Sequence, residues 1–307
     1  MNKENTSAPI VRVHPPGNTS VAAATMVYES PRILEKWVRY YGECFGRKNL
    51  FVLSHGECHE HRVVAKGCNF IVVPRELGES FDWQKSSALS SLVNLLLNFY
   101  GSVVCGDCDE LVIVDPSLKL SLADYINTLE PNSVVAPVGL NLLPGPNYFD
   151  CSQPYFKMDR PALSQCKQLE LAPKFSKPTI MRGPIRFAPG QHSLFDSDFK
   201  IDYSLYICHL KFMVVELVQK YEDLADEMNE FAIASGNEKF VPAWRKGIRH
   251  LHERVEISHI EQHDTAQHPG DLAKKHFTLY RKGRFLRVKE LPKRIRFRMA
   301  DEWLGIV

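Results

Sequence analysis

The fold expected for this chain is decided by residues 102–114, Ser102-Val103-Val104-Cys105-Gly106-Asp107-Cys108-Asp109-Glu110-Leu111-Val112-Ile113-Val114. Two apolar runs of strand length flank an acidic turn in this stretch. In an open α/β sheet, ligands bind beyond the carboxyl ends of the strands. Carboxylates gathered there are costly unless a cation neutralises them. The stretch therefore predicts a sheet edge with a metal-binding site, and the alternative is an acidic surface turn.

Towards the N-terminus, short apolar runs alternate with helical patterns. Ser30-Pro31 is typical of a helix start, with Ser as the N-cap and Pro at the first helical position. The expected strands are residues 21–28, 49–53, 70–73, 102–105 and 111–114, and the expected helices begin at Ser30 and span residues 81–100. Strands that alternate with helices predict βαβ units and a mostly parallel sheet.

Towards the C-terminus, we expect a helix at 121–129, a strand at 134–143, a long functional loop region at 144–176 and a helical stretch at 203–231. The predicted class is α/β, a mixed, mostly parallel sheet flanked by helices, with an α-rich basic C-terminal extension. The expected organisation is a flexible leader at 1–20, a main domain at 21–240 and the extension at 241–307.

Composition places the chain among ordinary globular proteins, with 44% apolar and 24% charged residues. The net charge of +2 gives no overall electrostatic footprint for nucleic acid, so no nucleic-acid partner is expected. No apolar stretch is long enough for a transmembrane helix, and the N-terminus lacks the apolar core of a secretory signal. Eight scattered cysteines do not resemble a disulfide framework. We expect a cytoplasmic protein, with the inner face of the membrane as a further location.

Residues 274–298 carry an uneven charge, eleven basic residues against the single acid Glu290. Such a segment faces water or an anionic partner. We consider a membrane surface or an anionic glycan as that partner. The alternative is a stretch that packs its aromatic side chains on the body and leaves its Lys and Arg in water.

An ordered set of short motifs resembles the family-2-like glycosyltransferases of the type A fold. The set covers about residues 21–220 and comprises Thr25-Met26-Val27-Tyr28, Trp37-Val38-Arg39-Tyr40-Tyr41, Leu50-Phe51-Val52-Leu53-Ser54-His55-Gly56, Pro74-Arg75, Phe81-Asp82-Trp83-Gln84-Lys85, Asp107-Cys108-Asp109-Glu110-Leu111, Gly139-Leu140-Asn141, Lys177-Pro178, Pro189-Gly190-Gln191-His192-Ser193 and His209-Leu210-Lys211.

The resemblance implies an inverting transfer of sugar from a nucleotide-sugar donor to a glycan acceptor. In the family, Asp-x-Asp binds a Mn²⁺ or Mg²⁺ complex of the donor diphosphate, and a later His is a further ligand. Asp107, Asp109 and His209 match these positions. For His209, the alternative is a hydrogen-bonded core histidine.

The resemblance also suggests which residues surround the donor. These are Tyr28, Glu29, Ser54, Asp82, Lys85, Asp107 and Lys211. Lys85 has a physical argument of its own, because the first turn of a helix favours phosphate through its N–H groups and dipole. A solvated lysine is the alternative for both Lys85 and Lys211.

The general base of an inverting transfer must reach the acceptor hydroxyl. We name the carboxylates Asp150 and Asp159 as candidates for this role, and His192 as a further catalytic candidate that contacts donor or acceptor. His192 follows a Pro-Gly turn, and its alternative is an ordinary loop histidine. Asp196, Asp198 and Asp202 also precede His209, and the sequence singles out none of the acids.

Two departures from the family keep a second class of function open. Many relatives carry Asn-Glu after the first strand and Asp before His-Gly, where this chain has Glu29-Ser30 and Ser54. A non-catalytic carbohydrate- or partner-binding protein with the same fold is therefore the alternative. A third hypothesis is zinc or redox chemistry at Cys105 and Cys108 with the cluster His55, Cys58, His59 and His61.

Overall fold

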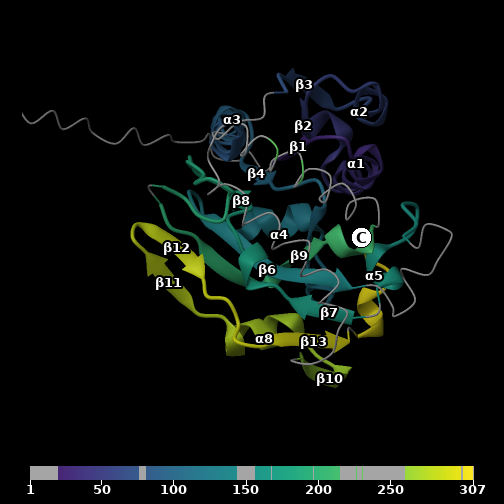
Figure 1. Cartoon of the computed structure of the whole chain (residues 1–307), viewed down its shortest axis with the longest axis vertical. Coiled ribbons are helices and arrows are strands. Elements are labelled where there is room, and N and C mark those ends of the chain that lie inside the picture. The colour runs from purple at the N-terminus through teal and green to yellow at the C-terminus, as the bar shows by residue number, and fades with distance from the viewer. Residues whose placement is uncertain are drawn as a thin grey trace, which may run out of the picture.

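The computed structural model of the chain describes residues 20–75, 81–143, 156–166, 168–195, 197–214, 226, 230, 260–298 and 300–306. The leader expected at 1–20 lies outside the described residues except for Ser20, and so does the candidate base Asp150. A central sheet of eleven strands organises the described part of the chain (Figure 1). The α/β class and the mixed sheet flanked by helices are confirmed.

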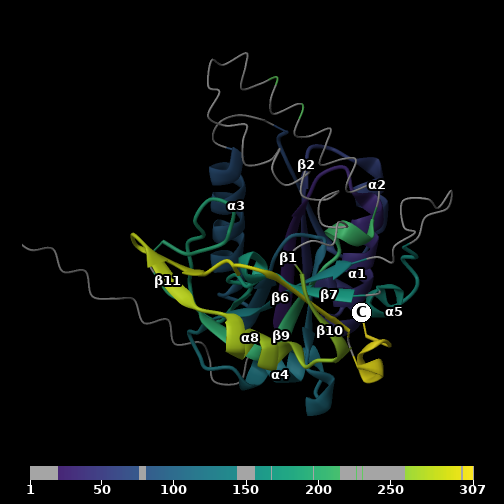
Figure 2. The same cartoon turned by 60° about the horizontal axis from the view of Figure 1, so that its bottom comes forward.

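The N-terminal half is a parallel α/β unit. Its strands are β1 (Val21–Val27), β2 (Leu50–His55), β3 (Asn69–Val73) and β4 (Ser102–Cys105), and its helices are α1 (Pro31–Phe45), α2 (His59–Val64) and α3 (Phe81–Leu96). The strands lie in the order β4-β1-β2-β3, and each pairing is parallel. Helix α3 lies on one side of these strands, and α1 and α2 lie on the other (Figures 1 and 2). The carboxyl ends of the four strands therefore share one edge.

Helix α1 follows the expected pattern. Pro31 opens the helix, and its apolar face is buried against the sheet through Ile33, Leu34, Trp37, Val38 and Tyr41. Fully burying one such aliphatic or aromatic side chain contributes about 1.5–3 kcal/mol. The Ser30 side chain makes no capping hydrogen bond, so burial of the apolar face fixes this helix.

The second half of the sheet is mixed. It contains β5 (Glu110–Val114), β6 (Val134–Leu143), β7 (Gln168–Leu171), β8 (Ile180–Met181) and β9 (Lys200–His209), with α4 (Leu122–Thr128) and the short α5 (Ala162–Gln165). Strand β9 pairs antiparallel with β5 and parallel with β6, while β6 pairs antiparallel with β7 and β8. Antiparallel β8 joins this half to β4.

Two expectations for this half need correction. Residues 203–209 form the end of β9 and not a helix, because the run Leu205–Cys208 is buried on both faces of the sheet. A continuous apolar run of that length does not distinguish a buried strand from a helix. The region expected to be a loop at 144–176 contains β7 and α5 within its described part.

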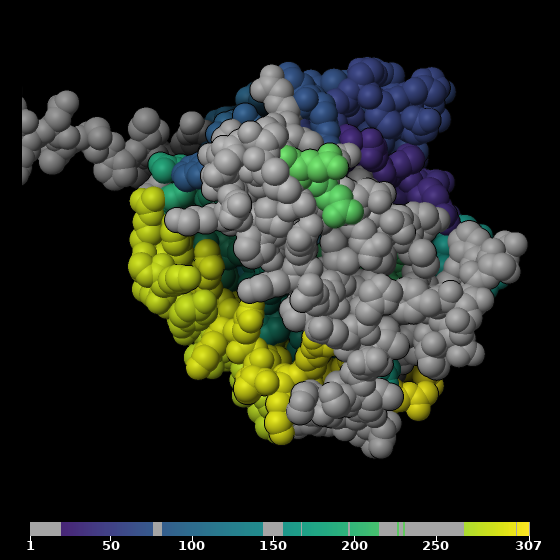
Figure 3. Space-filling model, viewed as in Figure 1, coloured from purple at the N-terminus to yellow at the C-terminus, as the bar shows by residue number. Residues whose placement is uncertain are grey.

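The C-terminal segment is also not α-rich where it is described. It contains β10 (Ile260–Ala266), α8 (Pro269–His276), β11 (Leu279–Lys282), β12 (Phe285–Val288) and β13 (Arg294–Arg298). Strand β13 pairs with β7 and β10, so the sheet continues past the boundary expected at residue 240. The segment runs along the left and lower edges of the molecule in Figure 3. Ile295 and Phe297 bury apolar side chains at period two, which is the strand pattern.

No helix in the described ranges combines the length and the apolar character that a membrane crossing requires.

Candidate functional site

The acidic turn lies where the sequence predicts it, between β4 and β5. Strand β4 ends at Cys105 and β5 begins at Glu110, so residues 106–109 cross the edge that the carboxyl ends of β1 to β4 share. Glu110 pairs directly with His209 at the end of β9. This register brings a residue about 100 positions further along the chain beside the turn.

Two lysines hold Asp107. Lys85 Nζ of α3 lies 2.6 Å from Oδ1 of Asp107, and Lys177 Nζ lies 3.1 Å from Oδ2. Lys177 also lies 2.9 Å from Oε1 of Glu110, and both side chains of that pair are almost fully buried. Each carboxylate oxygen of Asp107 therefore has a lysine ammonium group beside it.

These contacts shift the pKa values of Asp107, Lys177 and Glu110. Burial alone would raise the pKa of Asp107, but Lys177 and Lys85 hold that pKa well below its usual range. Burial alone would lower the pKa of Lys177, but Asp107 and Glu110 raise it. Burial raises the pKa of Glu110 to about 7, since Asp107 and Asp109 add to the effect and Lys177 offsets only part of it.

Asp109 faces His209. Nε2 of His209 lies 3.3 Å from Oδ2 of Asp109, and Nδ1 lies 2.9 Å from Oδ1 of Asn141 on β6. Oδ2 of Asp109 is buried and has no hydrogen-bond partner among the described residues. The ring of Phe175 lies 3.9 Å from the His209 ring, centroid to centroid. Burial lowers the pKa of His209, which favours the neutral imidazole.

These atoms fit a divalent cation in part. A carboxylate oxygen and an imidazole nitrogen are both metal ligands, and an orphaned oxygen that faces such a nitrogen is a place for a cation. Asp107, the third residue predicted as a ligand, is turned towards Lys85 and Lys177. Across the described ranges, no three His, Cys, Asp or Glu side chains are grouped closely enough to hold a metal by themselves.

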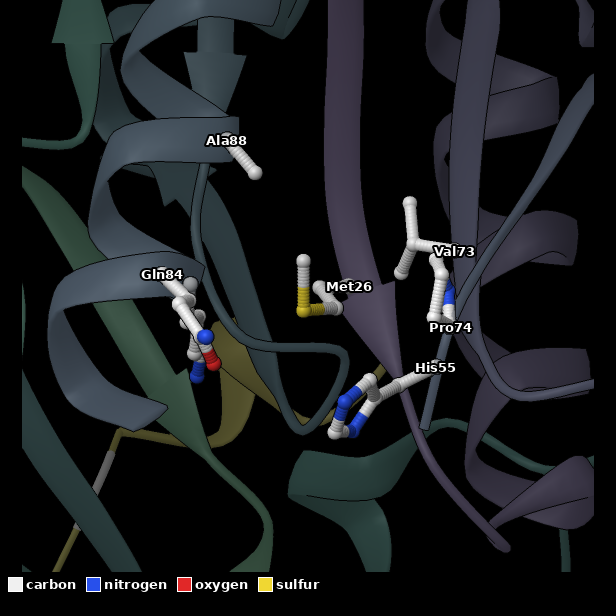
Figure 4. Close-up of a pocket in the computed structure, with 7 residues that line it drawn as sticks. Met26, His55, Val73, Pro74, Gln84 and Ala88 are labelled. Atoms are coloured by element: carbon white, nitrogen blue, oxygen red, sulfur yellow. The ribbon is translucent and has the colours of Figure 1, made fainter. Parts of the chain in front are cut away.

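A cavity of about 190 Å³ lies beside Lys85 at the same edge of the sheet. Its lining residues are Met26, His55, Val73, Pro74, Gln84, Lys85 and Ala88. In Figure 4, Met26 and His55 project into the space between α3, which carries Gln84 and Ala88, and the end of β3. Lys85 lines this cavity and also contacts Asp107, so the cavity and the acidic turn are neighbours.

One rim of the cavity is built around His55. Nη1 of Arg75 lies 3.1 Å from Nδ1 of His55, and the Arg75 guanidinium lies 3.3 Å from the centre of the Tyr28 ring. Burial lowers the pKa of His55, and Arg75 and Lys85 add to this effect. Tyr28, predicted near the donor, is therefore close to the cavity.

Other predicted donor residues are placed differently. The hydroxyl of Ser54 is buried, donates to the carbonyl oxygen of Gly56 at 2.7 Å and lies 2.8 Å from Nδ1 of His61. Glu29 is exposed and accepts a hydrogen bond from the Tyr28 hydroxyl. Asp82 is half-buried, and burial raises its pKa while Lys85 opposes the shift. Lys211 is close enough to Asp109 and His209 to lower the pKa of both.

The two catalytic candidates that the structure describes, Asp159 and His192, lie in different surroundings. Asp159 is exposed and lines a surface hollow with Arg32, Glu35 and Arg39 of α1. His192 lies near the site, because the Phe175 ring that contacts His209 also lies 6.3 Å from the His192 ring, centroid to centroid. Burial lowers the pKa of His192, and the charges of Lys177 and Lys174 lower it further.

Sequence reasoning missed the roles of several buried polar residues. These are Glu110, Lys177, Asn141, Glu170 and Arg296. The signal that could have found one of them is a single polar residue inside an apolar strand, because Asn141 is the one polar side chain of the fully buried β6. Glu170 lies between Leu169 and Leu171, and Arg296 lies between Ile295 and Phe297, but other polar residues in these two strands hide the signal.

The zinc hypothesis gains no support from the geometry. Cys105 is buried in β4, and burial raises the pKa of its thiol to about 12. Zinc binds the thiolate and not the thiol. Nδ1 of His61 lies 2.8 Å from the Ser54 hydroxyl, so this imidazole nitrogen is engaged by the end of β2.

No family model and no curated protein matches this sequence closely enough to indicate a family. Among solved structures, the WbbM bifunctional glycosyltransferase in its apo form is similar to 43% of this chain, with 11% sequence identity and a TM-score of 0.25. The match spans 24% of the WbbM chain, which is about a quarter of its length.

Proposed function

We propose that this protein transfers a sugar from a nucleotide-sugar donor to a hydroxyl of a glycan acceptor, at the turn between β4 and β5. The observation that carries the proposal is the buried pair of Oδ2 of Asp109 and Nε2 of His209, 3.3 Å apart beside the lysine-bound Asp107. The family resemblance of the ordered motifs supports the same assignment.

Asp109 and His209 are the residues that would hold Mn²⁺ or Mg²⁺. The cation would stabilise the negative charge that develops on the departing nucleoside diphosphate. Lys85 and Lys177 place two ammonium groups on Asp107. Lysine binds phosphate as a point charge, so the donor diphosphate would compete with Asp107 for these groups. Lys85 and Lys177 would thus neutralise part of the negative charge of the diphosphate.

The cavity beside Lys85 suits the nucleoside of the donor. Its lining is largely apolar, with His55, Gln84 and Lys85 as polar groups, which is the usual composition of a small-molecule site. The planar guanidinium of Arg75 over Tyr28 adds a flat surface at its rim. The base would lie against this rim, with the diphosphate towards Lys85.

His192 is the general base in this proposal, in which the negative charge of the donor diphosphate would raise the pKa that burial, Lys177 and Lys174 lower. Nδ1 of His192 lies 2.8 Å from the carbonyl oxygen of Lys174, which only accepts, so Nδ1 carries the proton and Nε2 keeps its lone pair. The acceptor oxygen bonds to the anomeric carbon while the bond from that carbon to the phosphate oxygen breaks. The nucleoside diphosphate leaves, and the acceptor proton passes to Nε2 of His192.

A screen of nucleotide sugars tests the proposal. We expect one of them, with Mn²⁺, to raise the melting temperature of the protein and to be hydrolysed slowly without acceptor. The Asp109→Asn variant should lose both effects, and the exposed Asp271→Asn variant is the matched control. Binding without hydrolysis or transfer would favour the non-catalytic alternative. The absence of any binding would contradict both.

A further inference from the structure

A row of polar side chains crosses the sheet and ends at His209. Arg296 of β13 pairs with Glu170 of β7, Glu170 pairs with Asn141 of β6, and Asn141 pairs with His209 of β9. Directly paired residues of neighbouring strands point to the same face of the sheet. Four residues that are far apart in the sequence therefore lie side by side.

Hydrogen bonds join every step of this row. Nε of Arg296 lies 3.2 Å from Oε2 of Glu170, Nδ2 of Asn141 lies 3.1 Å from Oε1 of Glu170, and Nδ1 of His209 lies 2.9 Å from Oδ1 of Asn141. The exposed fractions of the four residues range from 1% to 6%, so bulk water does not supply alternative partners. A buried network of this kind is strongly constrained in the direction of its hydrogen bonds.

The direction of each bond follows from the chemistry of its groups. A guanidinium only donates, and the carboxylate that it pairs with only accepts. Asn141 must therefore turn its NH₂ group to Glu170 and its oxygen to His209. The oxygen of Asn141 accepts, so Nδ1 of His209 carries the proton. On the neutral ring, Nε2 keeps a lone pair, and that lone pair faces Asp109.

Acceptor oxygens lie beside both nitrogens of the His209 ring, Oδ1 of Asn141 at Nδ1 and Oδ2 of Asp109 at Nε2. With the opposite tautomer, Nε2 would donate to Asp109, but the lone pair of Nδ1 would then face the oxygen that the row turns towards it. The row instead directs the ring proton away from Asp109. A lone pair and a carboxylate oxygen 3.3 Å apart are complementary to a cation.

We infer that Arg296, Glu170 and Asn141 are positioning residues that fix the tautomer of His209 so that Nε2 is available to a divalent cation beside Asp109. The inference rests on the proposed function and deepens it, because it assigns a role at the donor site to the C-terminal strand β13. Partners of this kind orient metal-bound histidines in many proteins, and losing one weakens metal binding by about 10–100-fold.

The Glu170→Gln variant tests the inference, since it changes one group and keeps the shape. Arg296 only donates, so the new side-chain amide must turn its oxygen to Arg296 and its NH₂ group to Asn141. Asn141 then turns its own NH₂ group to His209, which moves the ring proton to Nε2. We expect nitrogen-15 NMR of histidine-labelled, metal-free protein to show Nδ1–H in the parent and Nε2–H in the variant. Loss of the signal in His209→Asn identifies it among the twelve histidines.

Affinity for Mn²⁺ is the second readout. Glu170→Gln should weaken it by about 10–100-fold, whereas the exposed Glu130→Gln, whose partner is Lys200, should leave it unchanged. Arg296→Met should also weaken Mn²⁺ affinity, because Glu170 loses the guanidinium that holds it in the row, and Arg296→Lys should restore that affinity. These variants keep the test intact if Glu170→Gln does not fold.

The outcomes are distinct. A parent with Nε2–H or a doubly protonated ring at neutral pH overturns the inference, and so does a folded Glu170→Gln variant that keeps Nδ1–H. A parent that shows Nδ1–H but binds no Mn²⁺ contradicts the proposed function, while the tautomer measurement on metal-free protein still decides whether the row orients the ring.

Discussion

Lys177 has a carboxylate on each side of its ammonium group, Asp107 at 3.1 Å and Glu110 at 2.9 Å. Its side chain is 2% exposed, and breaking a buried pair leaves charge without compensation. Lys177 therefore stabilises the fold and also compensates the negative charge of the acidic turn.

Replacing Lys177 with Met should lower the free energy of unfolding by about 3–5 kcal/mol, because Asp107 and Glu110 lose a buried partner. Lys200→Met removes a lysine from an exposed pair with Glu130 and should cost much less, because water screens such pairs. Urea unfolding of both variants measures the difference. Equal losses would mean that the buried pair contributes no more than a surface one.

His192 gives a second prediction at this scale. In His192→Asn, the side-chain NH₂ group can replace Nδ1–H against the Lys174 carbonyl, but no basic nitrogen remains. We expect transfer to fall by about 10²–10⁴-fold, with nucleotide-sugar affinity close to that of the parent. A variant that transfers sugar at the parental rate would remove His192 from the proton transfer.

Strand β6 and the segment after β7 approach each other at a glycine. A Cβ added to Gly139 would lie 2.4 Å from the carbonyl oxygen of Ala172 and 2.8 Å from Cβ of Phe175. The close approach places the Phe175 ring against His209. Only a residue without a side chain permits this contact.

Gly139→Ala should therefore lower the melting temperature and weaken Mn²⁺ binding together, because the backbone near Phe175 has to move. Overpacking of this kind costs about 1–3 kcal/mol. Gly305→Ala is the control, since no atom lies within 4 Å of its added Cβ. A Gly139→Ala variant with the melting temperature and the Mn²⁺ affinity of the parent would contradict this role for Gly139.

At the scale of elements, local patterns predict the N-terminal half and strand β6 well. Helix α1 and strand β6 follow from apolar spacing and length, and the acidic turn follows from its flanking strands. Strand β9 was missed because a run buried on both faces has no period that separates strand from helix. The partners of His209 were missed because they become neighbours only through the pairing of β13, β7, β6 and β9.

Across the whole molecule, the basic segment 274–298 divides into parts with different surroundings. Arg296 is buried in an ion pair with Glu170, and Arg281 pairs with Asp198. Replacing Arg296 therefore disturbs the sheet and does not test a surface role. Arg284 is exposed on the β11–β12 hairpin, where its guanidinium lies 4.4 Å from the centre of the Phe195 ring.

The hairpin is the better place to test an anionic partner. Arg284→Gln combined with Lys282→Gln should weaken binding of a sulfated or uronic-acid glycan at low salt. The difference should shrink as salt rises, because exposed charges are screened within about 8–10 Å at physiological ionic strength. Nucleotide-sugar binding should stay unchanged. If glycan binding changes neither with these substitutions nor with salt, the positive charge of the hairpin contributes nothing to glycan binding and only faces water.

Calorimetric titration of a nucleoside diphosphate into the protein, with and without Mn²⁺, tests the central claim most directly. The account predicts binding that depends on Mn²⁺ in the parent and is lost in Asp109→Asn, while the variant keeps the fold and melting temperature of the parent to within a few degrees. A folded Asp109→Asn variant that binds the diphosphate with Mn²⁺ as tightly as the parent would contradict the assignment of Asp109 and His209 as the metal site.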